Sequence, residues 1–164
     1  MKQNKYKSMA QFMKVVLTLL IISGGILICY IVIATIFSEK QTNKDLNSFF
    51  NCSLFIIGSF SLLIILDNLK RVLDSVIKVT PFIMSNVICL NRIAKCCFII
   101  SITYILNLIF NGQYKKLTLI SLNFVGIDIY AEFIIFFFAG CFVLVLAQVY
   151  KQAVQVKEEN DFTI

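Results

Sequence analysis

Histidine and tryptophan are absent from the 164-residue sequence, and proline occurs once and glycine six times. The lack of histidine excludes a histidine general base and any metal site built on imidazole ligands. So little proline and glycine also excludes a disordered or collagen-like chain. Charge is scarce as well: charged residues make up 15% of the chain, whereas about 25% is usual in a soluble domain.

Hydrophobic residues, by contrast, make up 59% of the chain, and the mean hydropathy is +0.88. Four runs carry no charged residue: 15–37, 46–66, 96–114 and 133–150. Each is close to the ~20 residues that an α-helix needs to cross the hydrocarbon core of a bilayer. The first and last runs have no polar face at helical spacing, which excludes buried helices of a soluble protein. The sequence therefore predicts an all-α membrane protein, in which one domain forms an up-down bundle of four transmembrane helices.

The first uncharged run resembles a signal peptide in that four lysines precede it. A secretory signal, however, has an apolar stretch of about 7–15 residues and ends in a small-x-small cleavage site. This run is 23 residues long and ends in Ala34-Thr35-Ile36-Phe37, which offers no such site. We therefore expect an uncleaved first helix.

The distribution of basic residues predicts the orientation in the membrane. One side receives eleven of them: Lys2, Lys5, Lys7, Lys14, Lys70, Arg71, Lys78, Arg92, Lys95, Lys151 and Lys157. The other side receives four: Lys40, Lys44, Lys115 and Lys116. Because the richer side faces the cytoplasm, both termini are predicted to be cytoplasmic. The basic residues are spread over three segments instead of forming one patch, so no direct nucleic-acid binding is expected.

The segment 67–95, between the second and third runs, does not resemble a loop. Apolar residues recur at helical spacing from Leu69 to Ile77. Acid precedes base by four residues twice, as Asp67 with Arg71 and as Asp74 with Lys78, which is the favourable order on a helix. The second helix is therefore predicted to continue about three turns into the cytoplasm.

Thr80-Pro81 is expected to end that helix, because proline disfavours a helical residue before it. The same pair suits the start of the next helix, with Thr80 as N-cap and Pro81 at the first position. The result is a cytoplasmic helical hairpin. Two interpretations stay open: the hairpin extends the bundle, or it is a docking surface for a cytoplasmic partner.

The segment 113–132 is apolar and alternates in a strand-like way, which predicts a short strand pair or an interfacial segment. Asp128 and Glu132 lie four residues apart before the last run. They could hold a cation, although acids at a helix start also complement the helix dipole, and we favour that interpretation.

Six cysteines occur, but no CxxC spacing indicates a metal site. The uncharged runs contain no paired acids, no base and no activated nucleophile, so we expect no enzyme, no metal and no cofactor. Small residues do cluster in the runs and indicate close helix contacts; the clusters are at Ser23-Gly24-Gly25, Gly58-Ser59 with Ser61, Cys97 with Ser101, and Ala139-Gly140.

Two short motifs carry a resemblance to a known family. They are Thr80-Pro81-Phe82 with Asn86, Leu90 and Arg92-Ile93, and the C-terminal Glu158-Glu159-Asn160-Asp161-Phe162-Thr163-Ile164. They resemble the signature of an uncharacterised family of small four-helix bacterial membrane proteins, a domain of unknown function. Phe162 stands where that family usually has Leu, and Ser85, Ile88 and Cys89 are neutral where relatives often carry charge.

The resemblance implies a multi-pass protein of the bacterial plasma membrane, in a regulatory partnership with a helix-turn-helix regulator of the XRE type. The candidate partner-binding residues come from the two motifs: Thr80, Pro81, Phe82, Asn86, Arg92, Glu159, Asp161, Thr163 and Ile164. We further expect the acidic tail, part of the segment 151–164, to dock on the basic hairpin. The alternative function is a small immunity or export-type protein that handles a peptide or small molecule. A homo-oligomer also remains open.

Overall fold

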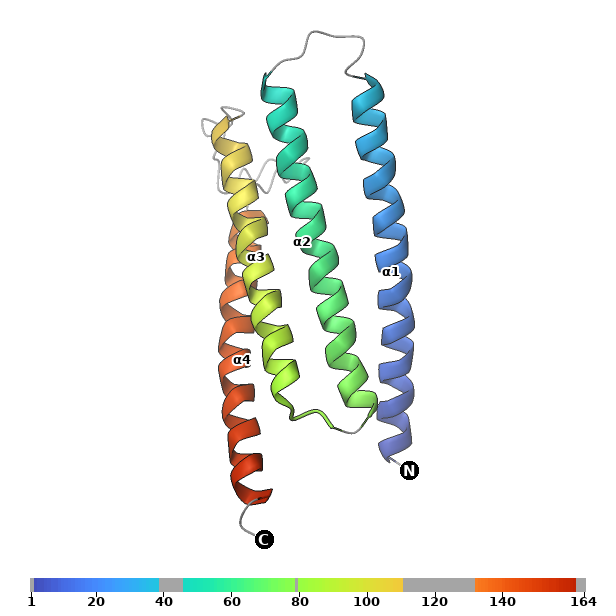
Figure 1. Ribbon diagram of the computed structural model, residues 1–164, viewed down its shortest axis with the longest axis vertical. Coiled ribbons are helices and arrows are strands. Elements are labelled where there is room, and N and C mark those ends of the chain that lie inside the picture. The colour runs from blue at the N-terminus through green and yellow to red at the C-terminus, as the bar shows by residue number, and fades with distance from the viewer. Residues whose placement is uncertain (1, 39–45, 79, 111–131, 162–164) are drawn as a thin grey trace, which may run out of the picture.

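The computed structural model describes residues 2–38, 46–78, 80–110 and 132–161. These residues form four helices: α1 (Lys2–Ser38), α2 (Leu46–Ile77), α3 (Met84–Phe110) and α4 (Glu132–Asp161) (Figure 1). All four are long and apolar enough to cross a membrane. The predicted all-α, four-helix membrane fold is confirmed. The strand pair predicted within 113–132, and Asp128 with it, lie outside the described residues, and Glu132 begins α4.

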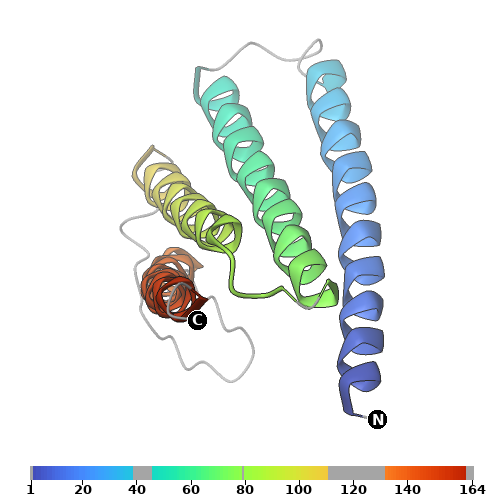
Figure 2. The ribbon, with the colours of Figure 1, turned by 60° about the horizontal axis from the view of Figure 1, so that its bottom comes forward.

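Successive helices are antiparallel, so α1 begins, α2 ends, α3 begins and α4 ends at the same end of the molecule (Figure 1). We call this the corner end, after the corner that residues 80–83 form between α2 and α3. Within the described residues, each helix packs only against its neighbours in the chain. The bundle is therefore an open row, in which α1 and α4 are the outer helices (Figure 2).

Buried residues recur every seven positions along the helices. On α2 they are Leu54, Ser61, Asn68 and Ser75, and on α4 they are Gly140, Ala147 and Val154. The central helix α3 has buried residues on more than one side, because it packs against both α2 and α4. A seven-residue repeat keeps one narrow seam of a helix against its partner, as in a left-handed coiled coil.

Small residues bring the helices close together. A Cβ atom at Gly140 would lie 3.1 Å from the Phe98 ring and 3.3 Å from the Ala94 carbonyl oxygen. At Gly58 it would lie 3.5 Å from Thr103 Oγ1, and at Gly24 it would lie 3.5 Å from Leu63. The close contacts predicted at these three glycines are confirmed. The contact at Gly140 is the tight one, those at Gly58 and Gly24 are ordinary van der Waals contacts, and a Cβ at Gly25 would meet nothing within 4 Å among the described residues.

The corner differs from the prediction in its detail. As expected, α2 continues without interruption past the uncharged run to Ile77. The Thr80 N–H then donates to the Ser75 carbonyl at 3.0 Å, the bond to the fifth residue back that commonly closes a helix. The next helix begins only at Met84. The prediction that Thr80 caps α3 and that Pro81 is its first residue is therefore wrong, because Thr80 completes the end of α2 instead.

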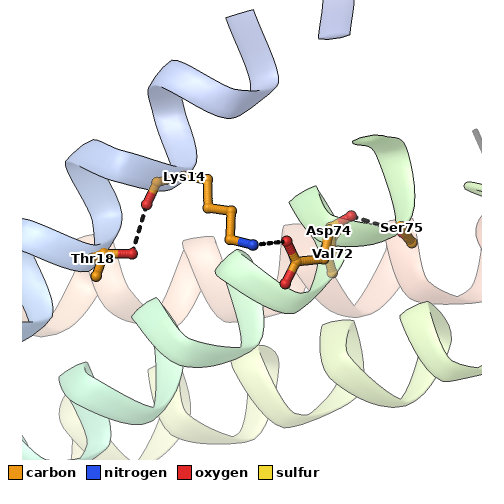
Figure 3. Close-up of polar contacts among 5 residues, drawn as sticks. All are labelled: Lys14, Thr18, Val72, Asp74 and Ser75. Carbon is orange, nitrogen blue, oxygen red and sulfur yellow. Dashed lines mark hydrogen bonds and ion pairs between the residues drawn. The ribbon is translucent and has the colours of Figure 1, made fainter. Parts of the chain in front are cut away.

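One of the two predicted ion pairs is confirmed. Arg71 Nε lies 2.8 Å from Asp67 Oδ2 within α2. Asp74, however, pairs with Lys14 of α1 at 2.5 Å and not with Lys78 (Figure 3). The reason is the face of α2 on which Asp74 lies: it is eleven residues, about three turns, from Leu63, which contacts α1 at Gly24.

Candidate functional site

The Pro81 carbonyl oxygen is the point at which the corner joins α3 and α4. It accepts hydrogen bonds from the Asn86 Nδ2 amide at 2.6 Å, the Tyr150 hydroxyl at 3.2 Å and the Ile83 N–H at 3.1 Å. Two of these donors come from different helices, α3 and α4. A single backbone acceptor therefore holds the corner against both of them.

Asn86 extends these hydrogen bonds to α2. Its Nδ2 amide also donates to Ser75 Oγ at 2.5 Å, and the Ser75 hydroxyl donates to the Val72 carbonyl at 2.7 Å. Asn86 is only 2% exposed. As a buried donor with two partners, it orders the corner from within and does not itself offer a surface to a partner.

The remaining motif residues lie on the outside of this corner. The Phe82 and Tyr150 rings pack with centroids 5.4 Å apart, while Phe82 stays 44% exposed. On α3, Met84, Ile88 and Arg92 are exposed at intervals of four residues, so they share one side of the helix. We call Phe82, Met84, Ile88 and Arg92 the motif face. Thr80 is also exposed, beside it in the chain.

The described part of the tail is helical. α4 continues through Asp161, and the bond from Tyr150 to Pro81 sets Tyr150 level with the corner. Glu158 and Glu159, which are exposed, therefore lie roughly 12 Å beyond the corner at 1.5 Å per residue. The described tail therefore continues as a helix past the corner, and the docking of the tail on the hairpin stays a prediction. The side chain of Asp161, and residues Thr163 and Ile164, lie outside the description.

A buried polar residue in the α2–α3 seam was not anticipated from the sequence. Asn68 is 4% exposed, and its Nδ2 amide donates to the Ile64 carbonyl at 2.8 Å. Its Oδ1 atom is buried with no hydrogen-bond partner among the described residues. The spacing of Ser61, Asn68 and Ser75, seven residues apart, was the signal that could have located this polar row.

At the end of the molecule away from the corner, a crevice of about 220 Å³ opens between α2, α3 and α4. Gly58 and Leu62 of α2 line it, together with Thr103 and Asn107 of α3. The ring of Tyr104 stacks on Phe136 of α4 at its edge, with centroids 6.0 Å apart. No group of three acids or cysteines able to hold a metal ion occurs in the part of the chain that the structure describes.

These features define the class of protein: an integral membrane protein of four antiparallel helices, joined at one end by a hydrogen-bonded corner. The chain belongs to the family described as Protein of unknown function (DUF2975), whose family model matches residues 4–164. The prediction that the chain belongs to an uncharacterised family, a domain of unknown function, is therefore confirmed. No curated protein and no solved structure matches the chain.

Proposed function

We propose that the protein is a regulatory membrane protein that binds a cytoplasmic partner at the motif face. The observation that carries the proposal is that exposed apolar side chains lie beside the Arg92 guanidinium, on a corner that hydrogen bonds hold in place. Phe82, Met84 and Ile88 are 44%, 47% and 49% exposed. All three lie between the uncharged runs 46–66 and 96–114 and not within them. Outside the uncharged runs, an exposed apolar surface indicates a protein contact more than a lipid contact.

The corner beneath the motif face is already ordered, so binding would lose little conformational entropy there. The hydrogen bonds of Pro81 to Asn86 and Tyr150 already connect the corner to α3 and α4. A partner would therefore meet side chains on a preformed surface. Arg92, at the edge of the motif face, suits a carboxylate on the partner, because a guanidinium can donate two parallel hydrogen bonds to it.

The predicted orientation and the family resemblance support the rest of the proposal. The corner shares its end of the molecule with both chain termini (Figure 1), and the excess of basic residues predicts that this end is cytoplasmic. The membrane would then be the bacterial plasma membrane. The partner that the resemblance implies is a small helix-turn-helix transcription regulator, retained at the membrane while it is bound.

The test is co-purification from detergent-solubilised membranes with full-length protein and with Ile88→Asp. The matched control is Leu69→Asp, which alters an exposed apolar residue of α2 at the same end of the molecule. We expect a DNA-binding protein to be recovered with the parent and with the control but lost with Ile88→Asp. If all three recover the same proteins in equal amount, the motif face binds no such partner.

The orientation needs its own test, because the partner must reach the corner. Reporter fusions at Lys78 should indicate the cytoplasm, and fusions at Lys44 should indicate the outside. A fusion at Lys78 that reports outside would contradict the cytoplasmic site.

The crevice supports a second candidate, an immunity or export-type protein that handles a peptide or small molecule. Its 220 Å³ and its polar Thr103 and Asn107 suit a small ligand or one peptide side chain. Ser59→Phe would fill the crevice. If that variant lost resistance to a co-encoded toxic peptide while Ile88→Asp kept it, this second function would replace the first.

A further inference from the structure

The outer side of α4 carries a continuous exposed apolar stripe. Its members alternate at three- and four-residue intervals: Ile135, Phe138, Phe142, Val145, Val149 and Val156, with Gln152 at the one polar position of the pattern. The apolar members are 57–66% exposed. They lie on the far side of the helix from Gly140, Ala147 and Val154, which are buried toward the bundle. We call them the outer stripe.

The register between helices shows where this stripe lies along the molecule. Between α3 and α4, the Ser101 hydroxyl bonds to the Phe133 carbonyl at 2.9 Å, and Gly140 lies against Ala94. Arg92 is therefore level with Phe142. Between α2 and α3, Ser75 bonds to Asn86 and Gly58 lies against Thr103, so the uncharged runs of those two helices are level with each other.

The uncharged run of α4 is therefore displaced along the molecule. Its middle is level with Arg92, whereas the middle of the α2 run, Ile56, is level with Ile105. The displacement toward the corner end is about 12 residues, or roughly 18 Å at the rise of an α-helix. Figure 1 shows the same shift, since α4 extends beyond the other helices at the corner end and stops short of them at the other.

One hydrocarbon layer cannot enclose the uncharged runs of α2 and α3 and also that of α4. A hydrocarbon layer of about 30 Å centred on the α2 and α3 runs leaves Val149 and Val156 outside it. A layer centred on the α4 run takes in Asp67, Arg71 and Arg92 instead, and charged side chains are expensive there. With the layer centred on the α2 and α3 runs, lipid would cover only the end of the stripe at Ile135 and Phe138, and a soluble partner would reach only the end that includes Val156.

We propose that α4 of a second copy of this chain covers the outer stripe, in a parallel, two-fold symmetric dimer. The two-fold axis of such a dimer runs along the membrane normal, so both α4 helices lie at the same depth. Each stripe residue then meets its own counterpart from membrane to cytoplasm. The alternation of three and four residues is the spacing of a coiled-coil seam.

Gln152 fits the same arrangement. At a symmetric seam its side-chain amide faces the amide of the other copy, and two amides can bond to each other. A single polar residue in an apolar seam is a common device for selecting register and number of chains. This dimer uses the outer side of α4, whereas the proposed partner uses α3 and the corner.

The experiment is oxidative cross-linking of full-length protein in its native membranes. Val149→Cys and Phe142→Cys each place a thiol in the outer stripe, the first toward its cytoplasmic end and the second near its middle. Gln148→Cys is the matched control, since it is exposed and adjacent in sequence but about 100° around the helix. The parent chain, which contains six native cysteines, measures the background.

We expect a band at twice the 18.7 kDa of one chain for Val149→Cys and Phe142→Cys, and background for Gln148→Cys and the parent. Equal cross-linking at positions 148 and 149 would indicate random collision and would overturn the dimer. So would absence of the dimer band when both stripe variants remain resistant to a water-soluble thiol reagent, because a different protein would then cover the stripe. Light scattering of the detergent-purified parent is the second measurement, and a mass of one chain per particle with no cross-link would also overturn the proposal.

Discussion

The two ends of the helix row, the pair α1–α2 and the pair α3–α4, differ in how closely they pack. The span with the highest mean hydropathy is the least buried, and the span with the lowest is the most buried. α1 has the highest mean hydropathy of the four spans, 2.8, yet only 6% of its apolar window is buried. α3 has the lowest, 2.0, and 39% of its window is buried. In lipid there is no hydrophobic gain from bringing apolar helices together, so small and polar residues decide the contacts. The most apolar helix is accordingly the one left to lipid.

The largest expected difference between the two pairs is steric. Gly140→Leu should destabilise the protein by about 3 kcal/mol, because overpacking a tight contact forces neighbours apart, and its Cβ alone would lie 3.1 Å from Phe98. Gly25→Leu should be neutral or stabilising by up to about 1 kcal/mol, since leucine favours helix over glycine. Thermal unfolding in detergent, followed by circular dichroism, measures both. Similar losses in the two variants would show that α1 is packed as tightly as α4.

The next expected effect concerns the hydrogen bonds of Asn86, which join α3 to α2 and to the corner. Asn86→Ala removes the amide donor to the buried Ser75 and one of the three donors to the Pro81 carbonyl, which should reduce stability by about 2 kcal/mol. Ser85→Ala, at the exposed neighbouring position, should change stability by less than about 0.5 kcal/mol. Proteolysis in detergent should also quicken near residue 80 in Asn86→Ala. An unchanged melting temperature would mean that the corner does not depend on Asn86.

A smaller effect is expected from a single hydroxyl. Tyr150→Phe keeps the ring against Phe82 but deletes the bond to the Pro81 carbonyl, which should cost about 1 kcal/mol. Tyr30→Phe makes the same change on α1, where the tyrosine is 69% exposed, and should have almost no effect. The comparison of melting temperatures isolates the link between α4 and the corner. If the two variants melt together, that link contributes nothing to stability.

Sequence reasoning was reliable for features that depend on one helix at a time. Uncharged runs predicted the four helices, helical spacing after Asp67 predicted the continuation of α2, and the pair Asp67–Arg71 followed from a four-residue rule. It failed where the partner lies on another helix. Asp74 has a suitable base four residues away, yet it pairs with Lys14, because the face of α2 that meets α1 is set by packing.

The hydrogen bonds of the corner were not predicted, for a related reason. Its central acceptor is the backbone carbonyl of Pro81, and every residue has such a carbonyl, so no residue type marks it. Tyr150 likewise looked only like the last residue of an uncharged run. The displacement of α4 could not be read from the sequence either, because it requires the register between helices, which contacts such as Gly140 with Ala94 determine.

The smallest expected effect concerns the ion pair that joins the loosely packed helix to the row. Lys14 and Asp74 have side chains 38% and 35% exposed, so solvent screens much of their attraction. A double-mutant cycle with Lys14→Met and Asp74→Asn should give a coupling energy of about 0.5–1 kcal/mol. The Arg71–Asp67 pair, whose side chains are 61% and 48% exposed, should couple less and serves as the control. Exchanging the charges, with Lys14→Asp and Asp74→Lys together, should restore most of the loss, and raising the salt concentration should reduce the coupling. A coupling energy that is zero, or that does not respond to salt, would mean that this ion pair does not hold α1 against α2, and that packing contacts such as those of Leu17 and Gly24 hold it instead.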